Sequence, residues 1–309
     1  MRLHRSIFSL FMLGVLLLTG TANAADPLTI DADSQYRFAQ SRLDADAFDE
    51  AIAEFNRFIH FFPDDPRVPR ARFQTGMAHY RAGRYPAAAA VFDRQTRNYE
   101  GLTLQNESFF MLSRSHADQG RTEQAILDLR NLTAVAADVD VIDRAHYEQG
   151  WLHVQQGQWQ QADRAFAAVT PANRNRYRIA GLRQSLAAHD AIPTKNPTLA
   201  GTFSIVPGGG QLYCNRYRDS LTAFLVNAGL ILAAWEAFDN DLPALGGVIT
   251  FVEFGFYAGN IYGAVSSAHK FNRDRVDAFK SHLNRNRPMP FLSLAPAPGG
   301  AALLLSFDF

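Results

Sequence analysis

The sequence has almost no cysteine and no excess of charge. Its 309 residues include one cysteine, Cys214, which excludes an internal disulfide framework and a CxxC metal or redox site. The thirty basic and thirty acidic residues cancel, so net charge gives no reason to expect a nucleic-acid partner. With 47% hydrophobic residues, the chain can still bury one or two domain-sized cores.

Signatures of catalysis and of nucleotide binding are also missing. The sequence has no HExxH and no GxSxG motif, and the acidic pair Asp49/Glu50 lies on a helix face where solvation explains it. The stretch PGGGQLYCNRY at 207–217 lacks the GK[ST] ending of a phosphate-binding loop, and no predicted strand precedes it. We therefore predict a protein that is not an enzyme and uses no cofactor and no metal.

The N-terminus has the three parts of a secretory signal peptide. A basic MRLHR is followed by the apolar SIFSLFMLGVLLLTG and by ANA at 22–24, an A-x-A cleavage site. This predicts that 1–24 are removed and that the mature chain starts near Ala25. The alternative is an anchor that stays attached, for which the apolar run is short. If the source is a bacterium, the body of the protein is exported to the periplasm.

The next 150 residues repeat with a period of 37. Each unit opens with an aromatic residue, continues with two small residues and a large apolar one, and has a glycine between two amphipathic helices. One such pair cannot bury its apolar face alone, but a stack of four can. We predict a mainly α fold, with an α-solenoid of about four helix pairs over 30–190. The recurring residues are Tyr36, Phe73, Phe110 and Tyr147; Ala39, Gly76, Ser113 and Gly150; Ala51, Ala88, Ala125 and Ala162; Phe55, Phe92, Leu129 and Phe166; and Gly83, Gly120 and Gly157.

These units resemble the tetratricopeptide repeat, with its Gly…Gly-x-Tyr…Ala…Phe…Pro pattern. GMAHYRAGRYPAAAAVF at 76–92 carries the pattern best, and FIHFFPDDP at 58–66 resembles the Pro-ended exit of such a repeat. The 37-residue period is most similar to a bacterial envelope group that includes the outer-membrane assembly lipoprotein BamD and the Tol-Pal factor YbgF. The resemblance covers about 35–170 and departs at Asp46 and Thr122. It implies binding of a peptide or protein on a concave surface, without identifying the partner.

Two sets of repeated side chains are candidates for function. His79, His116 and His153 recur at the repeat period, but equivalent positions in a solenoid lie roughly 10 Å apart, too far to share one metal. We expect these histidines to be structural. Aromatic residues on the concave face are candidate partner contacts, although aromatics at repeat spacing also serve as packing. The candidate partner-binding residues are Tyr36, Phe73, Met77, Tyr80, Phe110, Arg114, Tyr147 and Trp151.

Beyond the repeats, the sequence predicts a hydrophobic helical hairpin. A final helix over 173–190 is expected to cap the solenoid, and the Pro-containing 191–197 is expected to be a linker. No Lys or Arg lies between Arg218 and Lys270. The apolar runs 221–238 and 244–268 each approach the length that crosses a bilayer.

We therefore predict a membrane-associated helical domain over 198–272. The alternative is a helical hairpin buried in a soluble domain. Small residues at 255, 259, 263 and 267 are typical of close packing between membrane helices. Glu253 and Asn260 are seven residues apart, hence on one helix face, and should point into a helix interface or mark a functional site.

The glycine-rich stretch before the hairpin is interpreted as a tight bend. It is similar to the P-G-x-G-Q-x-Y signature of small bacterial membrane domains of unknown function, some of which resemble the TM2 type. This resemblance covers about 197–272 and implies a membrane location and no known activity. We expect the Gln211 amide to satisfy backbone groups that the bend leaves unpaired. The matching residues are Pro207, Gly208, Gly210, Gln211 and Tyr213.

Charge places the base of the hairpin on one side of a membrane. The basic flanks Arg216/Arg218 and Lys270/Arg273 favour the cytoplasmic side, whereas export would place the repeats in the periplasm. An additional crossing by 198–213 would reconcile the two. The alternatives are a hairpin that sits in a membrane without following this charge rule, or one that packs only at the membrane surface. The tail over 286–309 alternates apolar and other residues around a Pro-Gly-Gly turn, which predicts a C-terminal β-hairpin.

Two functions remain open from the sequence. The first is a membrane-anchored scaffold whose repeats face the periplasm and bind a protein or peptide partner, in envelope or membrane-protein assembly. The second is a small transporter-like or enzymatic membrane component with a polar centre at Gln211, Glu253 and Asn260.

Overall fold

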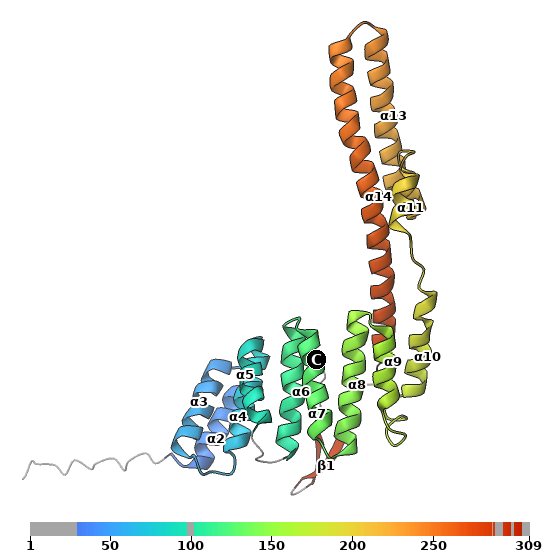
Figure 1. Ribbon diagram of the computed structural model, residues 1–309. Coiled ribbons are helices and arrows are strands. Elements are labelled where there is room, and N and C mark those ends of the chain that lie inside the picture. Colours follow the sequence, from blue (N-terminus) through green and yellow to red (C-terminus); the bar gives the residue numbers. More distant parts are fainter. Residues whose placement is uncertain (1–29, 98–101, 286, 288–292, 298–299, 305–309) are drawn as a thin grey trace, which may run out of the picture. The chain divides into compact units, whose positions relative to one another are not determined.

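The fold is mainly α-helical (Figure 1). Over its described residues, the computed structural model has thirteen α-helices, one short 3-10 helix and one two-stranded sheet. The predicted fold class, mainly α with a solenoid of helix pairs, is confirmed. The predicted signal peptide lies outside the described residues. The described residues are 30–97, 102–285, 287, 293–297 and 300–304.

The chain forms two compact units, Met1–Gln105 and Asn106–Phe309. In the first unit, the Tyr36 ring packs edge-on against the fully buried Phe55 and Phe58, with centroids 5.8 and 5.2 Å apart. This aromatic cluster is the core that joins the first helix pair to the next. The helices of this unit are α2 (Ala32–Asp44), α3 (Phe48–Phe61), α4 (Val68–Arg81) and α5 (Tyr85–Thr96).

The second unit contains two more helix pairs and a shorter helix. The pairs again run as antiparallel neighbours joined by tight turns, so the described residues contain the four predicted pairs. Their helices are α6 (Leu102–Asp118, whose first turn falls in the first unit), α7 (Thr122–Val135), α8 (Val139–Gln156), α9 (Trp159–Ala168), α10 (Ile179–Ala187) and the 3-10 helix η1 (Ala188–Ala191).

The 37-residue register is confirmed by burial. The second small residue of every repeat is fully buried, and a large apolar residue four positions later is buried with it. At the first small position, a Cβ added to Gly76 would lie 2.7 Å from the Phe92 ring. The absence of a side chain therefore lets the two helices of that repeat approach. The buried pairs are Ala51/Phe55, Ala88/Phe92, Ala125/Leu129 and Ala162/Phe166.

The turn inside each repeat uses a left-handed residue. Gly83, Gly120 and Gly157 have φ of +71°, +74° and +72°. The first repeat has Asp46 at the equivalent place, with φ +58°. Aspartate is one of the few residues with a side chain that tolerates this conformation, so the departure from the repeat pattern keeps the same backbone.

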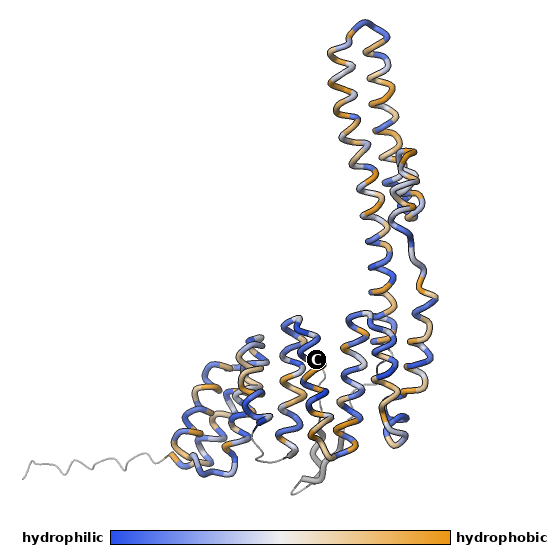
Figure 2. The backbone as a smooth tube through the Cα atoms, viewed as in Figure 1, coloured by the Kyte–Doolittle hydropathy of each residue, from blue (hydrophilic) through white to orange (hydrophobic). Residues whose placement is uncertain are grey.

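The C-terminal part of the second unit is a long helical hairpin preceded by two short helices. Residues 198–213 form helices of seven and five residues with a turn between them, so this segment does not supply the additional crossing considered above. Figure 2 shows hydrophobic residues spread along the hairpin and hydrophilic ones at its tip. The helices are α11 (Pro197–Phe203), α12 (Gly209–Tyr213), α13 (Tyr217–Asp239) and α14 (Pro243–Arg285).

Helix α14 joins the hairpin to the last repeat. Its 43 residues extend about 64 Å, well past position 272, the expected end of the helical domain. Leu283 near its end is fully buried in the same cluster as Trp151 and Phe166. Lys280 Nζ donates to the backbone oxygen of Gln155 at 2.7 Å. The last repeat is therefore capped by both α10 and α14. The sequence analysis predicted only the first of these caps, the helix over 173–190.

The C-terminal tail contains strands β1 (Ser293–Ala297) and β2 (Gly300–Leu304). They pair antiparallel, with Ser293 opposite Leu304 and Ala297 opposite Gly300. The turn residues 298–299 and the last five residues lie outside the described part of the chain.

Candidate functional site

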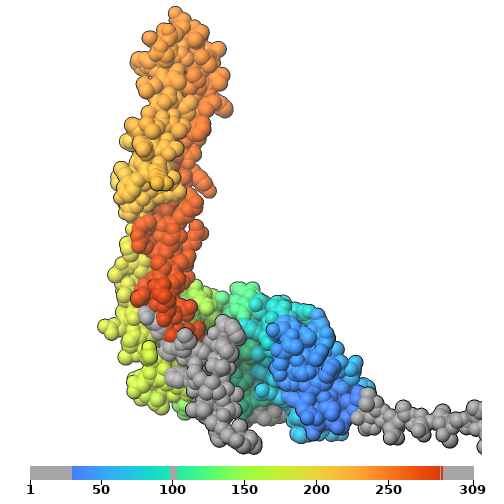
Figure 3. All heavy atoms as spheres, turned by 180° about the vertical axis from the view of Figure 1, so that it is seen from behind, coloured from blue at the N-terminus to red at the C-terminus, as the bar shows by residue number. Residues whose placement is uncertain are grey.

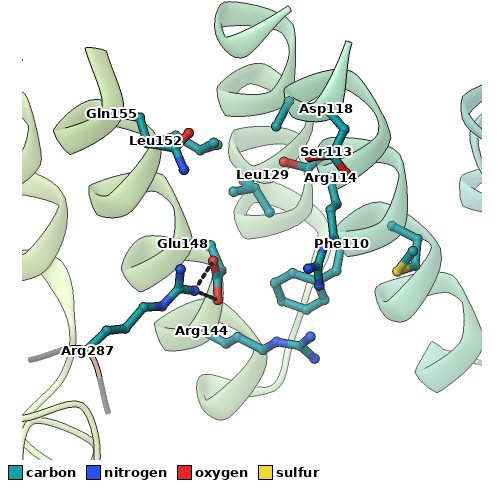
Figure 4. A pocket seen from close by; sticks show the side chains of 12 residues that line it. Phe110, Ser113, Arg114, Asp118, Leu129, Arg144, Glu148, Leu152, Gln155 and Arg287 are labelled. Atoms are coloured by element: carbon teal, nitrogen blue, oxygen red, sulfur yellow. Dashed lines mark hydrogen bonds and ion pairs between the residues drawn. The ribbon is translucent and has the colours of Figure 1, made fainter. Parts of the chain in front are cut away.

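The second unit has a small charged groove between the first helices of two neighbouring repeats (Figure 4). Its volume is about 160 Å³. Phe110 and Arg114 of α6 line one side, Arg144 and Glu148 of α8 line the other, and Arg287 reaches in from the segment after α14. We call these five residues the α6–α8 groove.

Charge pairs and an aromatic ring organise this groove. The Arg144 guanidinium stacks 3.8 Å from the centroid of the Phe110 ring and donates to Glu107 at 2.7 Å. Arg287 donates to both carboxylate oxygens of Glu148, at 3.0 and 3.1 Å. A planar guanidinium held on an aromatic face keeps N–H donors directed outward. The groove can therefore bind peptide carbonyls or carboxylates.

Only some of the predicted partner-binding residues line the groove. Phe110 and Arg114 do. Tyr36, Met77 and Tyr80 are half-buried, and Phe73 is buried against the Phe92 ring at 5.3 Å.

The prediction that Tyr147 and Trp151 contact a partner is corrected by their burial, since their side chains are only 4% and 3% exposed. The Tyr147 ring stacks on Tyr177 at 4.5 Å, and burial raises the pKa of Tyr147 to about 12. These two rings are core residues, since the cap from α10 and α14 covers the face they would otherwise present.

Sequence reasoning missed three charged members of the groove, Arg144, Glu148 and Arg287. Arg144, Glu148 and Leu152 follow one another at four-residue spacing on one face of α8, a signal that helical periodicity could have revealed. Arg287 had no such signal, because it is 139 residues from its partner Glu148.

Two of the three repeated histidines, His116 and His153, have local hydrogen-bond partners. Within their own repeats, His116 Nδ1 lies 2.6 Å from Asp128 Oδ2 and His153 Nδ1 lies 2.6 Å from Gln158 Oε1. Burial, followed by the nearby Arg84, lowers the pKa of His79. Across the described ranges, no group of three or more His, Cys, Asp or Glu is placed to hold a metal ion. The partners of His116 and His153 support a structural role.

The glycine-rich stretch forms a second polar centre, where it meets α14. Asn260 Oδ1 accepts from the Gly208 amide at 3.2 Å and from Gln211 Nε2 at 3.0 Å, and Asn260 Nδ2 donates to the Ser204 oxygen at 3.2 Å. Gln211 Nε2 also donates to the Asn260 backbone oxygen at 3.0 Å. The amide that satisfies the backbone of the bend therefore belongs to Asn260, and Gln211 holds Asn260 in place. The expectation assigned this role to Gln211, because sequence proximity hid a partner about fifty positions away.

The glycines of this stretch are required by close backbone packing. Gly208 has φ +84°. A Cβ on Gly208 would overlap the Ser220 carbonyl, and one on Gly210 would overlap the Ala200 carbonyl and lie 2.5 Å from the Ala264 Cβ. Pro207 is half-buried at the start of the bend. The Tyr213 hydroxyl accepts from the Asn196 amide at 3.1 Å. The signature residues thus have structural roles, with α11 and α12 packed on α14.

Glu253 lies outside this network. It is 9% exposed, and neither carboxylate oxygen has a hydrogen-bond partner among the described residues. Glu253 and Asn260 share a helix but not a site.

Helices α13 and α14 are long and apolar enough to cross a membrane. Only 17% of the most apolar window of each helix is buried. Large side chains remain exposed, among them Trp235 at 73%, Phe251 at 80% and Phe254 at 71%. On the face shown in Figure 3, no other described segment of the second unit covers the far end of the hairpin (orange).

Residues 36–101 and 110–176 match the family model of the tetratricopeptide repeat. Similar solved structures include a tetratricopeptide repeat protein from Parabacteroides merdae, with 14% identity and a TM-score of 0.42 over 82% of this chain and 98% of that one. MamA from Desulfovibrio magneticus RS-1 has 15% identity and a TM-score of 0.37 over 47% and 77%. A Rap protein complexed with competence and sporulation factor has 15% identity and a TM-score of 0.38, over 83% of this chain and 76% of that one.

Among curated proteins, none matches this chain significantly. The two matched segments are tetratricopeptide repeats, whose stacked helices other proteins use as surfaces for binding peptides and proteins.

Proposed function

We propose that this protein is a membrane-anchored adaptor of the cell envelope, whose tetratricopeptide repeats bind a protein or peptide partner. The observation that carries the proposal is α14, a single helix that is apolar and exposed over its first half and enters the core of the last repeat with Leu283. This arrangement suits an adaptor, because α14 connects the apolar hairpin directly to the core of the last repeat.

The hairpin supports a membrane location by its length and exposure. The uncharged run of α13, 220–235, is 16 residues and so spans about 24 Å, which approaches the hydrocarbon thickness when the flanking charged side chains extend to the interface. The hairpin also exposes several large apolar side chains, among them Phe251 and Phe254, and extended exposed apolar surface is typical of membrane or protein contact.

Both helices leave the membrane at the same end of the hairpin. The base of the hairpin and the last repeat therefore belong on one side, and the tip at Asn240 belongs on the other. We place the repeat side in the periplasm, because of the A-x-A site at 22–24.

Anchoring is tested with full-length protein in its native membranes. Alkaline carbonate should leave the protein in the membrane fraction. Replacing Phe251 and Phe254 together by Asp should release it, whereas the same change at Phe61 and Val135, exposed side chains of the repeats, should not. Release of the unchanged protein by carbonate would show that the hairpin packs elsewhere.

Sidedness is tested by cysteine labelling after Cys214→Ser. A cysteine at Arg130 should react with an impermeant maleimide from the periplasm, and one at Asn240 should not. The opposite pattern would place the repeats in the cytoplasm, the side that the basic flanks favour.

Partner binding is tested by photo-crosslinking from the α6–α8 groove. A crosslinking residue at Met111, which lines the groove, should capture a defined partner in intact cells. The same residue at Leu127, an exposed position of α7, serves as the control. Arg144→Ala should abolish capture from position 111, because it removes the guanidinium stacked on Phe110. Equal capture from both positions would disprove the groove as the binding surface.

The geometry of Gln211, Glu253 and Asn260 favours the adaptor over the alternative, a small transporter-like or enzymatic membrane component. Two of its three residues, Gln211 and Asn260, are hydrogen-bonded to each other and to the bend, and Glu253 lies outside that network.

A further inference from the structure

The base of the hairpin carries a concentration of positive charge from three separate chain segments. The segments 193–196, 213–219 and 269–275 hold six Lys or Arg and two Asp. The tip at 236–242 holds three acidic residues and no basic one. The hairpin therefore has a basic end next to the repeats and an acidic end away from them. The basic residues are Lys195, Arg216, Arg218, Lys270, Arg273 and Arg275, which we call the basic collar.

Hydrogen bonds to α14 bring the three segments together. The Lys195 backbone amide donates to Asn272 Oδ1 at 2.7 Å, and Asn272 Nδ2 donates back to the Lys195 oxygen at 2.9 Å. Arg216 donates to Ser267 Oγ at 2.9 Å. The linker that carries Lys195 and the start of α13 are thus both held against the same turns of α14.

The charge of the collar is only partly neutralised within the chain. Arg216 pairs with Asp219. Arg218, Lys270 and Arg273 are exposed and form no ion pair in the described part of the chain. The collar thus retains an excess of exposed cationic groups.

Aromatic side chains lie at the same level as these charges. Lys195 Nζ lies 4.6 Å from the centroid of the Tyr213 ring, and the Arg275 guanidinium lies 4.9 Å from that of Phe271. Tyr217, at the first residue of α13, is 65% exposed. Aromatic rings with cationic neighbours, where an apolar helix ends, are typical of the headgroup layer of a bilayer.

We propose that the basic collar binds the phosphate headgroups of anionic phospholipids in the leaflet that faces the repeats. This rests on the proposed membrane anchoring. Lys and Arg near an anionic lipid surface each add a favourable interaction, and a headgroup phosphate accepts several N–H donors at once. Uncharged headgroups offer no such gain, so the collar selects lipid by charge. The acidic tip has no equivalent attraction in the other leaflet.

The test uses full-length protein in nanodiscs of phosphatidylcholine, with trace spin-labelled phosphatidylglycerol or phosphatidylcholine as probe. The immobilised fraction of each probe reports lipid selectivity. The unchanged protein should prefer phosphatidylglycerol by about fivefold, as expected for one Lys or Arg at the surface. The triple variant Arg218→Gln, Lys270→Gln, Arg273→Gln removes the three exposed cations of the collar that have no ion pair, and it should lower this ratio markedly. The matched control Arg121→Gln, Arg130→Gln, Arg164→Gln changes three exposed arginines of the repeats and should keep the preference.

Each outcome bears on the proposal. No preference in the unchanged protein, or an equal preference in the triple variant, overturns it. Displacement of the labelled lipid by inorganic phosphate at equal ionic strength would identify a free-phosphate site and also overturn it. Protein that stays integral in phosphatidylcholine but lacks the preference would retain the proposed anchoring, whereas protein that leaves every nanodisc would disprove the anchoring itself.

Discussion

The repeats and the base of the hairpin both bring helices close through glycine, but against different neighbours. In the repeats, a Cβ on Gly76 or Gly150 would overlap the ring of Phe92 or Phe166. At the base of the hairpin, a Cβ on Gly208 or Gly210 would overlap a backbone carbonyl.

A ring is the movable end of a side chain and can be replaced by a smaller one, whereas a carbonyl belongs to a chain that must itself move. A glycine substitution in the repeats should therefore be repairable by a second substitution that makes the ring smaller. A glycine substitution in the glycine-rich bend should have no such repair.

The largest effect is expected at the bend. Gly210→Ala should prevent α12 from packing on α14, because its Cβ overlaps the Ala200 carbonyl and the Ala264 Cβ. We expect a loss of at least about 3 kcal/mol, the upper end for overpacking. Limited proteolysis of full-length protein in detergent should show cleavage between α11 and α13. Ala264→Gly should not restore protection, because the carbonyl overlap remains. Recovery in that double variant would remove the contrast with the repeats.

A smaller and repairable effect is expected in the fourth repeat. Gly150→Ala should lower stability by about 1–3 kcal/mol through overlap with the Phe166 ring. Phe166→Leu should cost stability alone but less than additively with Gly150→Ala, as a double-mutant cycle of thermal melting would reveal. Gly181→Ala in α10 is the matched control, since its Cβ meets no atom within 4 Å and the change should be neutral or stabilising. Strict additivity would mean that the ring does not set the requirement for glycine.

The two regions also differ in how they hold their loops. Asp143 accepts from the Thr170 amide at 2.8 Å, from Thr170 Oγ1 at 2.6 Å and from Asn173 at 2.8 Å. Burial raises the pKa of Asp143, but these bonds outweigh it, so the pKa lies below its ordinary value of 3.8. The bend is held instead by Asn260, an amide that does not titrate.

Acid should therefore weaken the repeats at Asp143. A carboxyl with a lowered folded-state pKa stabilises above its ordinary value, and this contribution is lost as the pH falls through the folded-state value. Asp143→Asn should cost about 1.5–3 kcal/mol at neutral pH and reduce the acid sensitivity of thermal melting. Asn260→Asp would be the reciprocal change and should add pH dependence at the bend. If the melting temperature of Asp143→Asn depended on pH as that of the unchanged protein does, other groups would be responsible for the acid sensitivity.

The smallest effect is expected within the hairpin. Gly255 and Gly259 border open space, whereas a Cβ on Gly246 would lie 2.8 Å from the Phe238 ring. In detergent, Gly255→Ala should change the free energy of unfolding by no more than about 0.5 kcal/mol and so leave the melting temperature nearly unchanged. Gly246→Ala should lower the melting temperature. A large loss at Gly255 would indicate a second helix packed on that face, as the predicted series of small residues implies.

The sequence alone determined the repeats. Their period of 37, their buried alanines and their turn glycines could all be predicted, because each contact lies within one helix pair or between neighbours in sequence. The two apolar helices could also be predicted from the sequence, since length and hydropathy are local quantities.

Tertiary structure decided which side chains these elements bring together. Asn260 and Gly208 are 52 positions apart, and Arg287 and Glu148 are 139 apart. Tyr147 and Trp151 are buried rather than exposed because Leu283, at the far end of α14, joins their cluster. No periodicity records such pairs, because the free energy that selects them comes from surfaces that meet only after the chain has folded.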